Sequence, residues 1–372
     1  MQYGSRRLTA PTVILVLACG WAWLQAGDLD PPPGPVVPTM KTLTEIEPRT
    51  PISSLPFTIS LSGSYYLTGN LTGGSGENGI TIAASDVTLD LNGFQLIGVP
   101  GSLSGIAVPE AQVNIAVRNG TIREWGGTGL EASLANNCQL ERLRAFNNAG
   151  NGLHVDQGST VVGCAARSNG LDGIIAGNAS TIRGCAARNN GGDGVQAGSG
   201  STVAYCTGRH NVDDGIQAGG GSTVIGCAAT SNDDDGINVG VGSTVSACTA
   251  TENGEDGIQA DVGSTVRACT SGLNVDDGIQ VTSGCHVVGN TCYSNGALNG
   301  AAGVRAIGAD NRIDGNHVTN NSLGIDVDGE GNLIVRNSAR ENATNYDIVE
   351  GNKVGAITAD PATAGPWSNF AF

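Results

Sequence analysis

The feature that most constrains the fold of this chain is a 21-residue phrase written six times between residues 151 and 284. Its cysteines recur at a constant spacing: Cys164, Cys185, Cys206, Cys227, Cys248 and Cys269. Its glycines recur at the same spacing: Gly152, Gly173, Gly194, Gly215, Gly236, Gly257 and Gly278. A fixed period this short predicts a solenoid, in which each coil of the chain stacks on the previous one.

The residues within one repeat predict short strands rather than helices. The phrase is Ser-Thr-Val-x-x-Cys-x-Ala-x-x-Asn-x-x-Asp-Gly-Ile-Gln-Ala, and segments such as 216–218 alternate apolar and polar side chains with a period of two. Three short strands and three bends fit 21 residues, and parallel strands then stack about 4.8 Å apart. The stacking predicts an apolar column one position after the glycines: Ile174, Val195, Ile216, Ile237, Ile258 and Ile279. The chain therefore predicts an all-β solenoid with a narrow core.

The recurring Asn-x-x-x-Gly-Ile phrase, with Cys or Asn five residues upstream, resembles the right-handed parallel β-helix repeat of the pectin lyase-like superfamily. The resemblance covers residues 57 to 350. It implies an all-β, right-handed parallel β-helix of about thirteen coils. It implies function only broadly, because that superfamily mixes lyases, hydrolases, epimerases and non-catalytic surface proteins.

The chain divides by composition into five segments. Residues 1–26 are interpreted as a signal peptide, with Arg6 and Arg7 before an apolar run and Ala26 at the expected cleavage position. Residues 27–56 are a Pro-rich linker, 57–100 an N-terminal cap and first coil, 101–350 the β-helix, and 351–372 a C-terminal cap or tail. We therefore expect a secreted, extracellular or cell-surface protein with no membrane insertion after signal cleavage. The imperfect lipobox ending at Cys19 leaves a lipoprotein as the minor alternative.

Net charge excludes some partners. The formal net charge is −16, and residues 151–283 hold 14 acidic against 5 basic side chains. Such a surface argues against nucleic acid and anionic membranes as partners.

The ten cysteines of the chain would suggest disulfides in an exported protein. Six of them occupy one column, and Asn290, Asn316 and Asn337 replace cysteine there in later coils. This pattern predicts a column of buried free thiols rather than disulfides or a zinc site.

An acidic column stands directly before the glycines: Asp172, Asp193, Asp214, Asp235, Asp256 and Asp277. Carboxylates stacked at strand spacing repel each other by about 1 kcal/mol in water and by more at low dielectric. Two interpretations remain open. The column is either a solvated turn edge, where Asp suits the bend, or a calcium site with Asp214, Asp235, Asp256 and Asp277 as ligands.

A polar column lies two positions after the glycines and is predicted to face outward: His154, Gln196, Gln217, Asn238, Gln259 and Gln280. Beside the acidic column it forms a candidate groove for sugar hydroxyls, although a solvated β-face would show the same residues. Asp213, Asp214 and Asp235 are the candidate catalytic acid and base, or would hold calcium to acidify a uronate proton. The Arg-x-Lys motif of the polygalacturonase-like family is missing.

The sequence thus predicts a secreted β-helix protein that binds, and in a catalytic version cleaves, an acidic or neutral extracellular polysaccharide. As an enzyme it would be a polysaccharide lyase or glycoside hydrolase, and calcium is the one cofactor that the acidic column suggests. The alternative is a non-catalytic structural or adhesive rod with a cation-stabilised acidic face. The sequence does not fix the oligomeric state.

Overall fold

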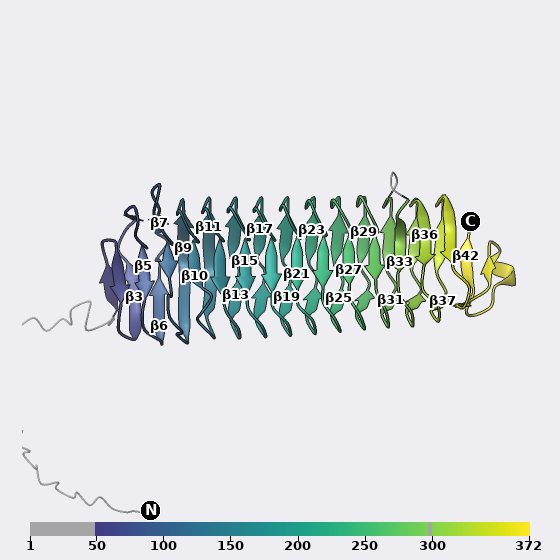
Figure 1. Cartoon of the computed structure of the whole chain (residues 1–372), viewed down its shortest axis with the longest axis horizontal. Coiled ribbons are helices and arrows are strands. Elements are labelled where there is room, and N and C mark those ends of the chain that lie inside the picture. The colour runs from purple at the N-terminus through teal and green to yellow at the C-terminus, as the bar shows by residue number, and fades with distance from the viewer. Residues whose placement is uncertain (1–48, 297–299) are drawn as a thin grey trace, which may run out of the picture. The chain divides into compact units, whose positions relative to one another are not determined.

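The structure, a computed structural model, describes residues 49–296 and 300–372 (Figure 1). The predicted signal peptide, the candidate lipidation site Cys19 and most of the expected linker lie outside these residues. Within them the chain winds into a solenoid whose coils each contribute parallel strands to successive faces. None of the described residues forms a helix that is long and apolar enough to span a bilayer.

The first face of the solenoid is a 14-stranded sheet to which every coil contributes one strand. Its strands, in order, are β2 (Phe57–Ile59), β5 (Ile80–Ile82), β8 (Ile106–Ala107), β10 (Leu130–Ala132), β12 (Leu153–Val155), β15 (Ile174–Ala176), β18 (Val195–Ala197), β21 (Ile216–Ala218), β24 (Ile237–Val239), β27 (Ile258–Ala260), β30 (Ile279–Val281), β33 (Ala302–Ala306), β36 (Leu323–Val327) and β39 (Thr344–Ile348). The spacing of the glycines predicts about thirteen coils, and the structure has fourteen.

The second face belongs to a 28-stranded sheet that also supplies the third. Its strands are β1 (Thr50–Ile52), β3 (Gly63–Leu67), β6 (Val87–Asp90), β9 (Ile115–Arg123), β11 (Gln139–Phe146), β13 (Thr160–Val162), β16 (Thr181–Arg183), β19 (Thr202–Ala204), β22 (Thr223–Ile225), β25 (Thr244–Ser246), β28 (Thr265–Arg267), β31 (His286–Val288), β34 (Arg312–Asp314), β37 (Leu333–Val335) and β40 (Lys353–Val354). Strand β1 pairs with β3, so the solenoid begins inside the segment expected to be linker.

The third face contains β4 (Leu71–Thr72), β7 (Gln95–Ile97), β14 (Ala165–Arg167), β17 (Ala186–Arg188), β20 (Thr207–Arg209), β23 (Ala228–Thr230), β26 (Thr249–Thr251), β29 (Thr270–Gly272), β32 (Thr291–Tyr293), β35 (His317–Thr319), β38 (Ser338–Arg340), β42 (Asn369–Ala371) and β41 (Ile357–Thr358). The long strands β9 and β11 run through the corner between the second and third faces and join them. The short 3-10 helix η1 (Pro361–Thr363) lies in the C-terminal segment.

The core is built from the apolar columns that the repeat predicts. Ile216 pairs in register with Ile237, Ile237 with Ile258, and all three side chains are fully buried. The nine described cysteines are free and buried, so the prediction of a column of buried thiols is confirmed. In several coils the backbone N–H of one cysteine donates to Sγ of the next, as from Cys206 to Cys227 at 3.4 Å.

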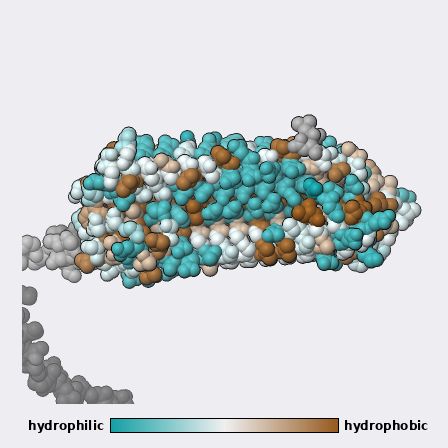
Figure 2. All heavy atoms as spheres, in the orientation of Figure 1, coloured by the Kyte–Doolittle hydropathy of each residue, from teal (hydrophilic) through white to brown (hydrophobic). Residues whose placement is uncertain are grey.

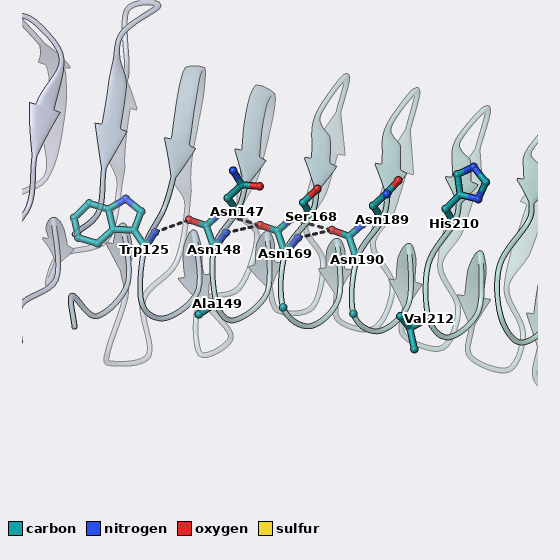
Figure 3. A pocket seen from close by; sticks show the side chains of 12 residues that line it. Trp125, Asn147, Asn148, Ala149, Ser168, Asn169, Asn189, Asn190, His210 and Val212 are labelled. Atoms are coloured by element: carbon teal, nitrogen blue, oxygen red, sulfur yellow. Dashed lines mark hydrogen bonds between the residues drawn. The ribbon is translucent and has the colours of Figure 1, made fainter. Parts of the chain in front are cut away.

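The corner before the first face is held by a buried row of asparagines, here called the asparagine ladder. Nδ2 of Asn148 donates to Oδ1 of Asn169 at 3.0 Å, and Asn169 donates likewise to Asn190 (Figure 3). The ladder continues through Asn211, Asn232, Asn253, Asn274, Asn295 and Asn321 to Asn342. Each amide thereby satisfies buried backbone groups at a bend, which unpaired would cost stability.

The C-terminal segment adds strands to the end of the solenoid. Strand β42 pairs with β38 of the last regular coil and with β41. Asn369 is fully buried and continues the column in which asparagine replaces cysteine, because its Oδ1 accepts from Nδ2 of Asn337 at 3.1 Å. Trp367, just before β42, remains 55% exposed.

Candidate functional site: a carboxylate row beside an amide column

The aspartates before the glycines form a continuous inner row at the edge of the first face. In each coil Oδ1 of one aspartate accepts the backbone N–H of the aspartate in the next coil, as Asp214 does from Asp235 at 3.1 Å and Asp235 from Asp256 at 2.9 Å. The row begins at Asp172 and ends where Oδ1 of Asp277 accepts the N–H of Ala302 at 2.6 Å. The turn before each glycine therefore uses a carboxylate oxygen as its acceptor.

The inner row is buried from Asp193 to Asp277, and Asp172 at its start is half-buried. Asp214 and Asp235 are each 3% exposed, and Asp277 is fully buried. The solvated-turn interpretation is therefore wrong for this row, because the next coil covers each carboxylate and its backbone hydrogen bond fixes it there. Sequence spacing placed the residues correctly but could not show which side of the turn they occupy.

A second set of carboxylates, the outer row, stands one residue earlier: Asp213, Asp234, Glu255 and Asp276. Asp213 is exposed, and Asp234 and Asp276 are half-buried. The two rows approach each other in two clusters in which one oxygen of each member lies within 4.8 Å of the others. These clusters are Asp234, Asp235 and Glu255, and Asp256, Asp276 and Asp277.

The inner row retains its protons at unusually high pH. Burial is the main cause, and repulsion between neighbouring carboxylates adds to it. The pKa rises to about 7 for Asp193, Asp256 and Asp277, and to about 8 for Asp214 and Asp235. In the outer row, repulsion by Asp234 is the main cause that raises the pKa of Glu255.

The polar side chains predicted to face outward form one column on the first face, here called the amide column. Gln196, Gln217, Asn238, Gln259 and Gln280 follow one another in parallel register, and each is half-buried. His154 belongs to the same column, but Ile175 separates it from the amides.

The amide column and the inner row are joined by hydrogen bonds. Nε2 of Gln196 donates to Oδ2 of Asp193 at 3.2 Å and to Oε1 of Gln217 at 2.9 Å. Nδ2 of Asn238 donates to Oδ2 of Asp235 at 3.3 Å. Gln280 donates to Asp256 in the coil before it. The two columns therefore form one polar surface, and Figure 2 shows hydrophilic side chains gathered across the middle of the solenoid.

Basic and acidic residues that the sequence analysis missed extend the amide column at both ends. His154 is in register with Glu131, and Gln280 with Arg305, which is followed by Asp326 and Asp347. Glu131, Arg305 and Asp326 each stand two positions after a glycine, as the residues of the amide column do. Applying the same offset to the irregular coils would have found them.

Glu131 lies beside His154, and Arg305 lies beside three carboxylates, those of Asp277, Asp326 and Asp328. Burial opposes ionisation of Glu131, but hydrogen bonds from His154 and Ser133 outweigh it and lower its pKa to about 2. Arg305 donates from Nε and Nη2 to Oδ2 of Asp328, both at 3.1 Å, and its Nη1 lies 3.7 Å from Oδ2 of Asp277.

Two open cavities adjoin this region. One of about 460 Å³ lies on the first face between the amide column and the following turns, lined by residues that include Ile175, Gln196, Gln217, Asn238 and Gly219. The other, of about 610 Å³, follows the asparagine ladder from Trp125 to His210 (Figure 3). Asn148, Asn169 and Asn190 in the second cavity are paired with each other along the ladder.

The candidate catalytic residues divide between the two rows. Asp213 belongs to the exposed outer row, whereas Asp214 and Asp235 belong to the buried inner row. The candidate metal ligands Asp214, Asp235, Asp256 and Asp277 all belong to the inner row. Of these four, Asp235 lies in one carboxylate cluster, Asp256 and Asp277 lie in the other, and Asp214 lies in neither.

Solved structures with the same fold include two from Azotobacter vinelandii. The A-module of the mannuronan C-5 epimerase AlgE6 is 19% identical, with a TM-score of 0.53 over 83% of this chain and 89% of that chain. The A-module of the mannuronan C-5 epimerase AlgE4 is 15% identical, with a TM-score of 0.56 over 79% and 91%. A double mutant of the periplasmic alginate epimerase AlgG is 12% identical, with a TM-score of 0.51 over 75% and 78%. At these identities the likeness shows the fold alone.

No curated protein matches the chain in sequence. The family described as "Right handed beta helix region" matches residues 58–207, 104–244 and 197–340, which together span most of the chain. The chain therefore belongs to the right-handed β-helix family.

Proposed function

We propose that the first face of the solenoid binds an extracellular polysaccharide, with the amide column between Gln196 and Gln280 as its main contact. The observation that carries this proposal is the register of that column, which repeats a primary amide at every coil, about 4.8 Å apart, beside an open cavity. An amide both donates and accepts hydrogen bonds, as a sugar hydroxyl does. A linear polysaccharide is a repeating ligand that fits a repeating surface.

The structural neighbours support the same substrate class. By their names, the two epimerases of Azotobacter vinelandii act on mannuronan, and the third acts on alginate. The right-handed β-helix is thus a fold on which enzymes act on polysaccharides, and the amide column supplies the contacts in this chain.

The inner row adjusts the charge of the surface. With pKa values of about 7 to 8, a large share of these carboxyl groups is neutral at pH 7. A neutral carboxyl group does not repel the carboxylates of an acidic saccharide bound beside it. The first face therefore repels an acidic polysaccharide less strongly than the net charge of −16 suggests.

A catalytic version of this proposal assigns acid and base to the two rows. Asp214 and Asp235, with pKa values of about 8, would act as proton donors, and the exposed Asp213 would act as the base. Such a pair would suit a polysaccharide lyase or a glycoside hydrolase. Loss of product formation in Asp213→Asn, with binding retained, would support this version, and unchanged turnover would exclude it.

The binding proposal is tested by titrating the protein with a panel of acidic and neutral polysaccharides, using calorimetry and affinity electrophoresis. The variant carries Gln196→Ala, Gln217→Ala and Asn238→Ala. The matched control carries Thr202→Ala, Thr223→Ala and Thr244→Ala, which change three consecutive coils of the second face. We expect binding that is lost in the amide variant and retained in the control. No binding to any member of the panel, or equal binding by the two variants, would overturn the proposal.

A second candidate function is a structural rod whose acidic face holds a divalent cation of the calcium class. The observation that favours it is the cluster of Asp256, Asp276 and Asp277. Oδ2 of Asp277 is buried and receives no hydrogen bond, and Arg305, the cation 3.7 Å away, is hydrogen-bonded to Asp328. Three carboxylates from two coils match the oxygen ligands that calcium prefers.

Calorimetry with calcium, together with thermal unfolding with and without EDTA, tests this candidate. We expect binding that Asp276→Asn weakens and that Asp233→Asn leaves unchanged. Asp233 is an exposed carboxylate outside both clusters, so it controls for net charge. If calcium gives no heat of binding and EDTA does not change the melting temperature, the protein does not bind the cation.

A further inference from the structure

A third cavity lies on the second face at the C-terminal end of the solenoid, away from the amide column. Strands β34, β37 and β40 place Arg312, Leu333 and Lys353 in one register column. The segment after β41 then brings Trp367 to the same place. Together with Val335 and Val354 these residues line a cavity of about 520 Å³, here called the Trp367 pocket.

The Trp367 pocket combines an apolar floor with an exposed aromatic wall. Val335 is only 3% exposed although its strand position faces outward, and Leu333 is half-buried. The Trp367 side chain is 55% exposed, and the guanidinium of Arg336 lies 5.2 Å from its ring centroid. This cation–π contact fixes the indole while leaving more than half of it available to a ligand.

The rim of the Trp367 pocket is basic in a strongly acidic protein. Lys353 is one of only two lysines in a chain whose net charge is −16. Among the described residues it forms no ion pair, and it is exposed. Arg312 donates to Oδ2 of Asp314 at 2.8 Å, and Arg336 pairs with the same carboxylate. One carboxylate thus serves two guanidinium groups, which leaves the rim with a net positive charge.

We propose that the Trp367 pocket binds a uronate residue of an acidic polysaccharide. The apolar face of the sugar ring would lie on the indole, and the uronate carboxylate would meet Lys353 and Arg312. A neutral sugar could use the indole but not the cations. The proposal rests on the proposed polysaccharide-binding function and specifies an acidic substrate for it.

Intrinsic fluorescence gives a direct readout. The only other described tryptophan, Trp125, is 1% exposed, and its Nε1 donates to the carbonyl of Leu96. We would titrate the protein with short oligouronates and with neutral oligosaccharides of equal length. We expect a saturable change in tryptophan emission with the oligouronate only, and no such change in Trp367→Phe.

Affinity measurements on three variants test the named residues. We expect Trp367→Ala to weaken oligouronate binding about tenfold, which corresponds to about 1.4 kcal/mol. Lys353→Gln should weaken it several-fold and reduce its dependence on salt concentration. Arg188→Gln, which removes an exposed cation on β17 of the third face, is the control and should bind like the parent. Thermal unfolding of each variant verifies that it is folded, and Trp367→Phe retains an aromatic ring if Trp367→Ala does not fold.

The outcomes separate this proposal from the one on which it rests. If oligouronate binding is lost in the amide variant but unchanged in Trp367→Ala and Lys353→Gln, the Trp367 pocket is not a sugar site and the amide column remains. If the Trp367 variants alone weaken binding, the pocket stands and the amide column does not. If no saccharide binds the parent protein, both proposals fail.

Discussion

The carboxylates of the regular middle coils and those of the end coils differ in their electrostatic surroundings. In the middle, Asp214 and Asp235 are buried beside other carboxylates, and burial with this repulsion raises their pKa to about 8. Toward the C-terminus, hydrogen bonds from Arg336 and then Arg312 lower the pKa of Asp314. The middle coils therefore hold carboxyl groups whose negative charge, when they ionise, is not neutralised by cationic side chains of the protein.

The difference in charge neutralisation between the two regions affects stability and binding. At the ends, hydrogen bonds from neighbouring side chains favour the ionised form of carboxylates such as Asp314 and Glu131. Uncompensated carboxylates in the middle weaken the protein when ionised, unless a proton, a cation or a bound ligand relieves them. A surface with that property is suited to binding.

The largest expected effect is on the pH dependence of stability. The inner-row pKa values lie above those of an unfolded aspartate, near 3.9, so the native state binds more protons than the unfolded state from about pH 4 to 8. The free energy of unfolding should therefore fall as pH rises from about 4 to 8, by on the order of 5 kcal/mol in total because the sites are coupled. Denaturant unfolding between pH 4 and 9 measures it.

Carboxylates of the end coils determine how the free energy of unfolding changes at acidic pH. Glu131, with its pKa of about 2, and Asp314 stabilise the fold above about pH 4 and lose that contribution as the pH falls further. The profile should therefore have its maximum near pH 4 to 5. A maximum at pH 8 would contradict the contrast between the two regions.

The next effect concerns calcium. At a concentration one hundred times its dissociation constant, a ligand that binds only the native state stabilises it by about 2.7 kcal/mol. We expect calcium to raise the melting temperature at pH 8, where the inner row ionises, and to have little effect at pH 5, where it is protonated. Magnesium at the same ionic strength is the control. Equal stabilisation by both ions would mean that they only screen the repulsion between carboxylates and that calcium has no specific site.

A pair of single substitutions compares the regions directly. Asp314→Asn removes a carboxylate that accepts hydrogen bonds from two arginines, so it should destabilise the protein by about 1–3 kcal/mol. Asp235→Asn keeps an oxygen that can accept the N–H of Asp256 but removes a buried charge, so at pH 8 it should stabilise the protein by about 1 kcal/mol. Denaturant unfolding at pH 8 measures both. Equal destabilisation would show that the middle row is also neutralised.

The smallest effect concerns the break in the amide column. Ile175 stands in register between His154 and Gln196, and its side chain is half-buried. Ile175→Gln should extend the column by one coil and tighten polysaccharide binding about twofold, because one further hydrogen bond contributes about 0.5 kcal/mol. Ile175→Ala is the control for loss of the apolar side chain. Weaker binding by the glutamine variant would mean that Ile175 itself contacts the sugar.

The sequence allowed the solenoid to be predicted because its period is unbroken from Cys164 to Cys269 and fixes the register of every column. The positions of Gln217 and Asn238 followed from that register. The count of coils fell one short, because the first strands, β1 to β4, have no regular spacing. The buried free thiols were also predicted, because asparagine and cysteine exchange in one column only if that column faces inward.

The environment of the acidic column could not be predicted from spacing. Whether Asp235 faces water or the next coil depends on the turn geometry, and the hydrogen bond from the N–H of Asp256 is what buries it. The Trp367 pocket was missed for a related reason. It joins Arg312 to a residue more than fifty positions later, and no repeat connects them.

The central claim, that the middle carboxyl groups keep their protons at neutral pH while the arginine-paired Asp314 does not, is tested most directly by carbon-13 NMR of the aspartate side chains across a pH titration. Assignments would come from Asp214→Asn, Asp235→Asn and Asp314→Asn. The account predicts that the Asp214 and Asp235 signals titrate near pH 8, and that the pKa of Asp314 lies below the usual range of an aspartate. If all three titrate together near pH 4, the two regions do not differ and the account is wrong.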